Sequence, residues 1–306
     1  MIKEEYDFND ISSYLFSKID LIITGEPNEE SRSSFIIDKW KGRGKPHLSL
    51  NLKGVNQVNY RYTDPERNMS EFSDVIDIMN GLPDIMKGIS ISKKNVLVDL
   101  SSLDHVLSMV LIKQLIKQYS PKCLFAAYAR PEKYHTTLGS DGLLLSDSIN
   151  GVKAVPGYVK REIENQTLCA FVGFEGIRLK AVLESLNNIN KIVPIVAFPS
   201  GGLHWFKTTM WQSMDVFETE TRDLTIRKCF SESVFDAISI LEEVQKQEDK
   251  IVVAPLGTRP HSVATAIFAT KYPNTRIIYD YVVERQNRTE GISHVCVYHL
   301  SSFLET

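Results

Sequence analysis

The polar turn from Ala254 to Pro260 has the residue types best suited to bind a phosphate group. Gly257 allows the backbone to approach a ligand closely, and Thr258 and Arg259 supply a hydroxyl and a cation. The turn lies between an apolar run and a helical segment, so the positive end of the helix dipole would face a bound anion. Pro260 suits a first helical turn, which needs no backbone donor. The pattern predicts a phosphate-binding turn, and an ordinary surface turn with an arginine is the alternative.

Two further turns combine carboxylates with a guanidinium group. Glu29, Glu30 and Arg32 follow the first apolar run, and Glu175 and Arg178 follow a later one. A carboxylate and a guanidinium at this spacing could orient a phosphate or a ribose. They could also form a salt bridge at the start of a helix, where acidic residues are common. Both interpretations stay open at this point.

Other candidate residues also stand at the ends of apolar runs. Ser101 and Ser102 form a polar turn without a cation, and Tyr281 could stack on a nucleobase. His105 and His261 are weak candidates for an acid or base in phosphodiester cleavage, with a structural role at a helix start as the alternative. The sequence contains no Ser-His-Asp or Cys-His set, no His-Glu-x-x-His motif and no Walker A run.

Short apolar runs alternate with segments of helical periodicity along the whole chain. This alternation is typical of α/β proteins with mainly parallel sheets. Strands are expected over residues 21–23, 47–50, 95–98, 124–128, 168–172, 192–198, 251–254 and 277–279. Helices are expected over residues 31–41, 70–82 and 103–119, after Arg178, after Ser231, and from about Pro260. In the stretch 70–82, Phe72, Ile76 and Met79 fall on one helical face.

Several landmarks recur in the same order in both halves of the chain. They lie at offsets of about 150 residues, which suggests an internal duplication. The matched positions are Arg32 with Arg178, the stretch ending in His105 with the one ending in His261, and Tyr128 with Tyr281. A domain boundary is expected in the Gly-, Ser- and Asp-rich stretch 133–159. The sequence therefore predicts two Rossmann-like lobes over residues 1–145 and 146–306.

Composition narrows the class of protein. The 306 residues are 43% hydrophobic and carry a net charge of −3, which argues against disorder and against a bulk nucleic-acid-binding surface. The four cysteines lack zinc-site spacing, and Cys123 and Cys169 are expected to be buried thiols. We expect no metal or cofactor. The longest apolar runs fall far short of the ~20 residues of a membrane span, so we expect a cytoplasmic protein without membrane contact.

The stretch 251–269, followed by 277–279, resembles the signature of CARF domains, the Rossmann-like sensors of cyclic oligoadenylates in CRISPR-associated proteins. That signature runs from a strand through Gly-Gly-Thr-Lys to a helix. Here Leu256 replaces the first glycine and Arg259 replaces the lysine. Arginine keeps the charge and adds a bidentate donor set, but it is not equivalent to lysine. The departure bears on ligand identity more than on fold.

With two such lobes, the chain resembles a SAVED-type sensor, in which two CARF-like lobes are fused. The resemblance implies a cyclic oligonucleotide-type ligand, a role in antiviral defence in prokaryotes and a separate effector protein. It also implies an asymmetric site, with Thr258 and Arg259 on one side and Ser101 and Ser102 on the other. A homo-oligomer is also possible. The alternatives are a metal-independent phosphodiesterase of the ring-nuclease type and a structural subunit of a multi-protein defence complex.

Overall fold

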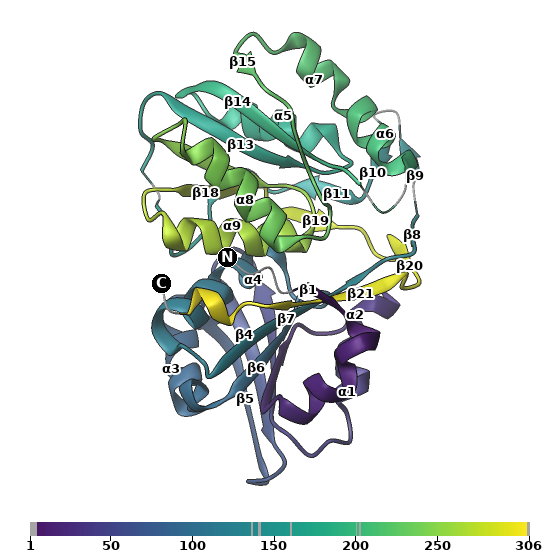
Figure 1. Cartoon of the computed structure of the whole chain (residues 1–306), viewed down its shortest axis with the longest axis vertical. Coiled ribbons are helices and arrows are strands. Elements are labelled where there is room, and N and C mark those ends of the chain that lie inside the picture. The colour runs from purple at the N-terminus through teal and green to yellow at the C-terminus, as the bar shows by residue number, and fades with distance from the viewer. Residues whose placement is uncertain are drawn as a thin grey trace. The chain divides into compact units, whose positions relative to one another are not determined.

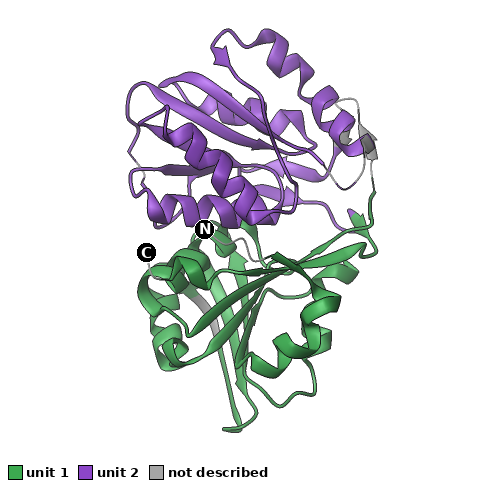
Figure 2. Cartoon of the chain, in the orientation of Figure 1, with its two compact units in different colours: residues 1–135, 289–306 green, residues 136–288 purple. Residues whose placement is uncertain are grey.

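The computed structural model describes residues 5–135, 137–139, 142–159, 161–199, 201 and 203–304. The chain has a mixed α/β fold with sheets of mostly parallel strands, as the alternation of apolar runs predicts. It divides into two compact units (Figure 2). Unit 1 consists of residues 1–135 and 289–306, and unit 2 of residues 136–288.

Eight of the described strands form the sheet of unit 1, in the order β1-β21-β7-β6-β2-β3-β4-β5. Their bounds are β1 Glu5–Asp7, β2 Leu21–Thr24, β3 His47–Lys53, β4 Gln57–Asp64, β5 Met69–Asp77, β6 Asn95–Asp99, β7 Cys123–Arg130 and β21 His294–His299. The four central strands, β7-β6-β2-β3, run parallel. The near-continuous apolar sequences of β2, β6 and β7 fit this arrangement, because helices cover both faces of a parallel sheet. β3 instead alternates half-buried and buried residues.

The helices of unit 1 bury those central strands (Figure 1). They are α1 Phe8–Lys18, α2 Ser31–Trp40, α3 Gly81–Gly88 and α4 His105–Gln114, which continues as a π-helical turn over Leu115–Tyr119. Residues of α1 and α2, including Phe16 and Trp40, pack with Leu97 of β6 in one core cluster. The neighbours Val96 and Val98 are also fully buried and, by the alternation of a strand, face the opposite side of the sheet.

The segment predicted as a helix over residues 70–82 is a strand for most of its length. β5 pairs antiparallel with β4, which itself pairs antiparallel with β3. Arg61 of β4 lies opposite Phe72, and its guanidinium carbon is 5.8 Å from the centre of the Phe72 ring. The helical spacing of the apolar residues is overridden here because β4 offers an open edge for hydrogen bonding. The helix that follows, α3, begins only at Gly81.

Unit 2 contains a second sheet, in the order β12-β18-β17-β13-β14-β15, with β16 also pairing with β14. The bounds are β12 Lys153–Ala154, β13 Gln166–Val172, β14 Ile189–Ala197, β15 Asp223–Leu224, β16 Arg227–Cys229, β17 Ile251–Pro255 and β18 Arg276–Tyr279. All of these pairings are parallel except that of β12 with β18. Short antiparallel pairs complete the described strands: β8 Lys133–Tyr134 with β20 Thr289–Glu290, β9 Thr137–Gly139 with β10 Gly142–Leu144, and β11 Ser146–Ile149 with β19 Val282–Glu284.

The helices of unit 2 are α5 Gly176–Ser185, α6 Leu203–Gln212, α7 Met214–Thr219, α8 Val234–Gln245 and α9 Arg259–Lys271. Leu168 and Ala170 of β13 pack with Val182 of α5 in one core cluster. Phe171 points to the opposite face, where its ring stacks on His261 of α9 at 4.6 Å. The fully buried strand β13 is therefore sandwiched between helices on both faces.

The division of the chain differs from the predicted domains of 1–145 and 146–306. After unit 2 the chain returns to the first sheet, where β21 pairs antiparallel with β7 on one side and with β1 on the other. Apolar side chains cause this return, because Val297 and Tyr298 are fully buried in unit 1.

The central parallel strands follow the same order in both sheets. In chain order they are β2, β3, β6 and β7 in unit 1, and β13, β14, β17 and β18 in unit 2. In each unit the first of these strands lies between the second and the third. Along the described part of the chain, no helix has both the length and the apolar character needed to cross a membrane.

Candidate functional site

The predicted phosphate-binding turn lies at the carboxyl edge of the sheet in unit 2. Parallel strands bring their carboxyl ends to one edge, and ligands in open α/β sheets bind there, at the point where the strand order reverses. β13 and β17 are the two strands that flank this point. The turn after β17 contains Leu256, Gly257 and Thr258, and Arg259 is the first residue of α9.

Thr258 and His261 hold this turn through contacts within the protein. The Thr258 hydroxyl donates to the Ser231 carbonyl at 2.5 Å, and its backbone N–H donates to Nδ1 of His261 at 3.3 Å. Nε2 of His261 lies 3.2 Å from the Phe230 carbonyl. Burial lowers the pKa of His261 to about 4, so the ring is neutral at pH 7 and donates from Nε2. These contacts favour the structural interpretation of His261 over the catalytic one.

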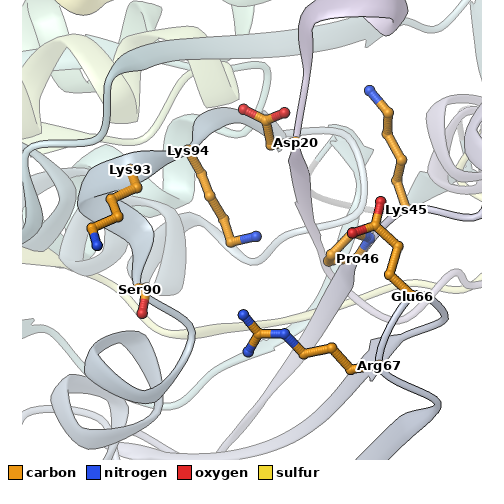
Figure 3. A pocket seen from close by; sticks show the side chains of 8 residues that line it. All are labelled: Asp20, Lys45, Pro46, Glu66, Arg67, Ser90, Lys93 and Lys94. Atoms are coloured by element: carbon orange, nitrogen blue, oxygen red, sulfur yellow. The ribbon is translucent and has the colours of Figure 1, made fainter.

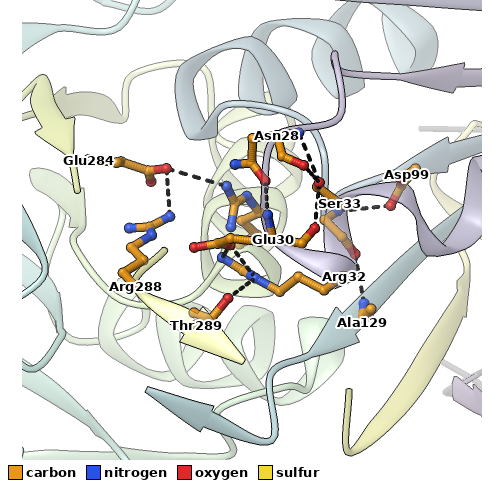
Figure 4. A network of polar contacts seen from close by, with 11 residues as sticks. Asn28, Glu30, Arg32, Ser33, Asp99, Ala129, Glu284, Arg288 and Thr289 are labelled. Carbon is orange, nitrogen blue, oxygen red and sulfur yellow. Dashed lines mark hydrogen bonds and ion pairs between the residues drawn. The ribbon is translucent and has the colours of Figure 1, made fainter. Parts of the chain in front are cut away.

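Arg259 brings a cation to the amino end of α9. One of its terminal nitrogens is 3.8 Å from the Glu284 carboxylate. Glu284 also forms an ion pair with Arg288 at 2.6 Å, which Figure 4 shows. Two guanidinium groups are thus held by one carboxylate beside the predicted turn. Arg259 is only 7% exposed, so its charge acts in a partly desolvated environment.

Arg178 ties three loops of the carboxyl edge together. Its guanidinium forms a bidentate pair with Asp280 at 2.6 and 2.7 Å, and it also donates to the Leu256 carbonyl at 3.3 Å. Burial by itself lowers the pKa of Arg178, but the Asp280 carboxylate outweighs burial, so the pKa is raised. Arg178 therefore positions the turn after β17 instead of presenting its charge to solvent. Asp280 follows the predicted strand 277–279 directly and was not among the candidate residues.

Glu175 has a different set of partners from the one its spacing suggests. One of its oxygens accepts the backbone N–H groups of Leu145 and Ser146, both at 2.9 Å. The other accepts the Ser146 hydroxyl at 2.8 Å. Glu175 thus anchors the segment at the start of β11 to the first turn of α5. Its carboxylate is buried and does not pair directly with the Arg178 guanidinium in any observed ion pair of the described residues.

In unit 1 the corresponding turn follows β6 and is built around Asp99. The Asp99 carboxylate accepts the backbone N–H of Ser101 at 2.9 Å and the Ser102 hydroxyl at 2.8 Å. The Ser101 hydroxyl accepts the N–H of Ala129 at 2.7 Å, as Figure 4 shows in part, and the Ser102 hydroxyl accepts the N–H of Gly25 at 2.9 Å. Both predicted hydroxyl groups therefore connect the ends of neighbouring strands.

The first acidic turn contains a buried salt bridge. Arg32 binds Glu30 through two nitrogens at 2.7 and 2.8 Å, and it also donates to the Thr289 hydroxyl at 3.1 Å (Figure 4). Arg32 and Glu30 are almost fully buried. The arrangement matches the salt-bridge alternative, and Glu29 lies exposed outside the pair.

The remaining candidates lie at element ends. His105 is the first residue of α4 and is buried, and Asp104 caps that helix by accepting the N–H of Val106 at 2.7 Å. Tyr281 has a left-handed backbone, with φ of 38°, and its ring packs edge-to-face on Tyr279 at 5.8 Å. His105 and Tyr281 therefore have packing roles, each at the carboxyl edge of the sheet in its own unit.

Two cysteines and two aromatic residues differ in how far they are buried. Cys169 is buried as predicted, whereas Cys123, at the start of an outer parallel strand, is only half-buried. Large apolar side chains of unit 2 are exposed: Trp211 is 68% exposed and Phe230 is 54% exposed. Apolar side chains that are exposed singly are normal on protein surfaces, so these two residues do not distinguish a subunit of a larger complex.

Comparison with protein-family models and with curated protein sequences finds no match.

Proposed function

We propose that the chain is a sensor that binds a phosphorylated nucleotide at the carboxyl edge of unit 2. The observation that carries this proposal is the placement of Arg259 as the first residue of α9, after the Gly257-Thr258 turn and beside the strand-order reversal. α9 has 13 residues, so the positive end of its dipole adds to the charge of Arg259. Phosphate groups bind at such helix ends in open α/β sheets.

The contacts of the turn indicate which groups would bind the phosphate. The hydroxyl of Thr258 is occupied by Ser231, and His261 is occupied by Thr258 and Phe230. The Arg259 guanidinium is therefore the side chain that would change partner on binding, moving from Glu284 to the more strongly charged phosphate. Arg178 is a positioning residue, since it fixes the Leu256 carbonyl.

The shared strand order of the two sheets supports a second part of the proposal. Both units place their central parallel strands in the same order, and both place a glycine after the first of these strands, at Gly25 and Gly173. We infer that unit 2 is a diverged copy of unit 1. The turn of unit 2 is followed by a cation, Arg259, which the Ser101–Ser102 turn of unit 1 lacks. An effector partner and a role in antiviral defence stay predictions that follow from the resemblance alone.

The proposal is tested by titrating the chain with a panel of linear and cyclic oligonucleotides in native mass spectrometry and calorimetry. We expect a stable one-to-one complex with at least one member. Arg259→Gln should weaken that complex at least about tenfold, because a hydrogen bond to a charged group contributes about 1.5–3 kcal/mol. Arg259→Lys should also weaken it, because lysine lacks the planar donor fork.

Lys246→Gln is the matched control. Lys246 is an exposed cation at the end of α8, and its removal changes the net charge by the same amount. The dissociation constant of the Lys246→Gln variant for the oligonucleotide should equal that of the native chain. Absence of binding across the panel, or equal affinities for Arg259→Gln and the native chain, would overturn the proposal. Turnover of the bound nucleotide would favour the phosphodiesterase alternative.

A further inference from the structure

A hollow of about 350 Å³ lies within unit 1, at the edge of the sheet opposite the Ser101–Ser102 turn. Asp20 stands directly before β2, Pro46 before β3 and Lys94 before β6, so the hollow is at the amino ends of three neighbouring parallel strands. The turn between β4 and β5 adds Glu66 and Arg67. The full lining is Asp20, Lys45, Pro46, Glu66, Arg67, Ser90, Lys93 and Lys94.

Local backbone features bring these residues to one place. Ser90 has a left-handed backbone, with φ of 57°, and begins a short 3-10 helix over Ile91–Lys93 that leads into β6. The hairpin turn is held by Asp64, which accepts the backbone N–H of Arg67 at 3.3 Å. Figure 3 shows the Lys94 ammonium and the Arg67 guanidinium extending from different elements toward the space between them.

The charges around the hollow are unbalanced. Four cations line it against two carboxylates, and one oxygen of Asp20 already accepts the Asn95 N–H at 2.8 Å. Lys45 donates to the Ile19 carbonyl at 2.5 Å, and Arg67 forms a long ion pair with Asp64 at 3.6 Å. Among the residues that the structure describes, the ammonium groups of Lys93 and Lys94 form no hydrogen bond or ion pair.

Like charges that share a hollow repel each other, and a bound anion would relieve this repulsion. The volume lies at the lower end of the roughly 300–1,000 Å³ of small-molecule sites. Lysine binds phosphate as a point charge and arginine binds it through two parallel N–H groups. The Ser90 hydroxyl and the Asp20 and Glu66 carboxylates offer partners for hydroxyl groups of the same molecule.

We propose that this hollow binds a small phosphorylated molecule, with a phosphate group between Lys94 and Arg67. The site is independent of the turn at Arg259, which belongs to unit 2, so either proposal can fail without the other. A bare phosphate chain and a sugar phosphate share the chemistry that Lys94 and Arg67 recognise. The carboxylates of Asp20 and Glu66 would favour the sugar phosphate, because they accept hydrogen bonds from its hydroxyl groups.

The test is calorimetric titration of the whole chain with pyrophosphate and, separately, with ribose 5-phosphate at fixed ionic strength. We expect a dissociation constant below about 1 mM for at least one probe. Lys94→Gln and Arg67→Gln should each weaken binding at least about tenfold, because each removes a charge-assisted contact. Tighter binding of ribose 5-phosphate than of pyrophosphate would show that the carboxylates contribute.

Two variants serve as controls in the same titration. Lys53→Gln removes an exposed cation from the far end of β3 and should leave the dissociation constant unchanged. Arg259→Gln should also leave this site intact. The proposal is wrong if the native chain binds neither probe, or if Lys53→Gln weakens binding as much as Lys94→Gln. It is also wrong if a single-stranded oligoribonucleotide binds at Lys94 more tightly than both probes, since that result identifies a surface for a polymer.

Discussion

At the scale of single residues, the buried His261 and the half-buried His47 make the stability of this chain depend on pH. Burial lowers the pKa of His261 to about 4, and burial with the nearby charge of Lys41 lowers the pKa of His47 to about 4. Both values lie below the ordinary value of 6.5. Between pH 6.5 and 4 the unfolded chain therefore binds protons that the folded chain excludes. The contribution of these two histidines to the free energy of unfolding is fully present above pH 6.5 and is lost as the pH falls toward 4.

We expect His261→Gln to reduce this dependence. The free energy of unfolding of the native chain should fall between pH 7 and pH 4.5, with about 2 kcal/mol of the loss due to His261, since one pKa unit corresponds to about 1.4 kcal/mol. In His261→Gln that part of the loss should disappear. Urea unfolding at several pH values measures both curves. The control is His204→Gln, which changes an exposed histidine of α6; a native-like slope in His261→Gln would contradict the expectation.

Residue types alone left the partners of the candidate side chains undetermined. Arg178 was a reasonable candidate for phosphate binding, yet its partner Asp280 stands 102 residues further along the chain. The same holds for Ser101, which binds the N–H of Ala129. A guanidinium or hydroxyl group at the end of a strand can bind a ligand or a neighbouring loop. Only the fold shows which of these partners it has.

At the scale of elements, the loops that follow the first and third parallel strands touch each other in both units. Gly25 follows β2, and a Cβ atom added there would lie within 1.9 Å of the Ser102 carbonyl oxygen. Gly173 follows β13, and a Cβ atom added there would lie 2.6 Å from the Leu256 carbonyl oxygen. Because the obstructing atoms belong to the backbone, they cannot move aside as a flexible side chain could. Both close approaches require glycine.

Gly25→Ala should therefore destabilise unit 1, whereas Gly88→Ala should not. The added methyl group at residue 25 forces a shift of the turn after β6, and overpacking of this kind costs about 1–3 kcal/mol. At Gly88, the last residue of α3, a Cβ atom meets nothing within 4 Å. Urea unfolding followed by fluorescence measures both variants. Equal stability of the two variants would show that the contact between the loops relaxes without cost.

Apolar runs predicted the central strands well and the hairpin poorly. Each predicted strand overlaps an observed one. Most of these strands are buried on both faces and therefore need a continuous apolar run, whereas β3 alternates half-buried and buried residues. The stretch 70–82 lacks such a run, and its apolar residues fit helical spacing. Its pairing with β4 decides the outcome, since β5 is an outer strand whose Phe72 remains 56% exposed.

At the scale of the whole molecule, the chain enters unit 1 twice. β21 lies between β1 and β7, so the described residues after Thr289 complete the sheet that the first 135 residues begin. Val297 is fully buried there and packs in the same cluster as Ala127 and Ala129. Unit 1 therefore depends on a segment that follows the whole of unit 2 in the sequence.

Val297→Asp should unfold unit 1 selectively. A charge without a partner in the core costs far more than the lost apolar burial. Hydrogen exchange with mass spectrometry should show lost protection in β2, β6 and β7, and native protection in β13 and β17. Val283→Asp makes the same change on β19, where the side chain is 44% exposed, and should preserve protection everywhere. Equal loss in both units after Val297→Asp would show that they unfold as one.

The cationic hollow could have been found from the sequence. Lys45 stands two residues before a predicted strand, and Lys93 and Lys94 directly precede another. Parallel strands place their amino ends at one edge, so these lysines were expected at the same edge of the sheet. The strand order β6-β2-β3 brings them together. Arg67 could not have been placed there, because residues 70–82 were expected to form a helix. Ligands usually bind at the carboxyl ends of the strands in such sheets, so a site at the opposite edge was not expected from the sequence.

Local sequence patterns were enough to predict the α/β class, the central strands and the turns that follow them. These features depend on local patterns: apolar runs that must be buried, and glycine or polar residues that interrupt them. Three other features could be learned only from the folded chain: the return of β21 to unit 1, the hairpin of β4 and β5, and the partner of each buried polar group. Such choices depend on contacts between residues far apart in the chain, where burial makes every unpaired donor or charge costly.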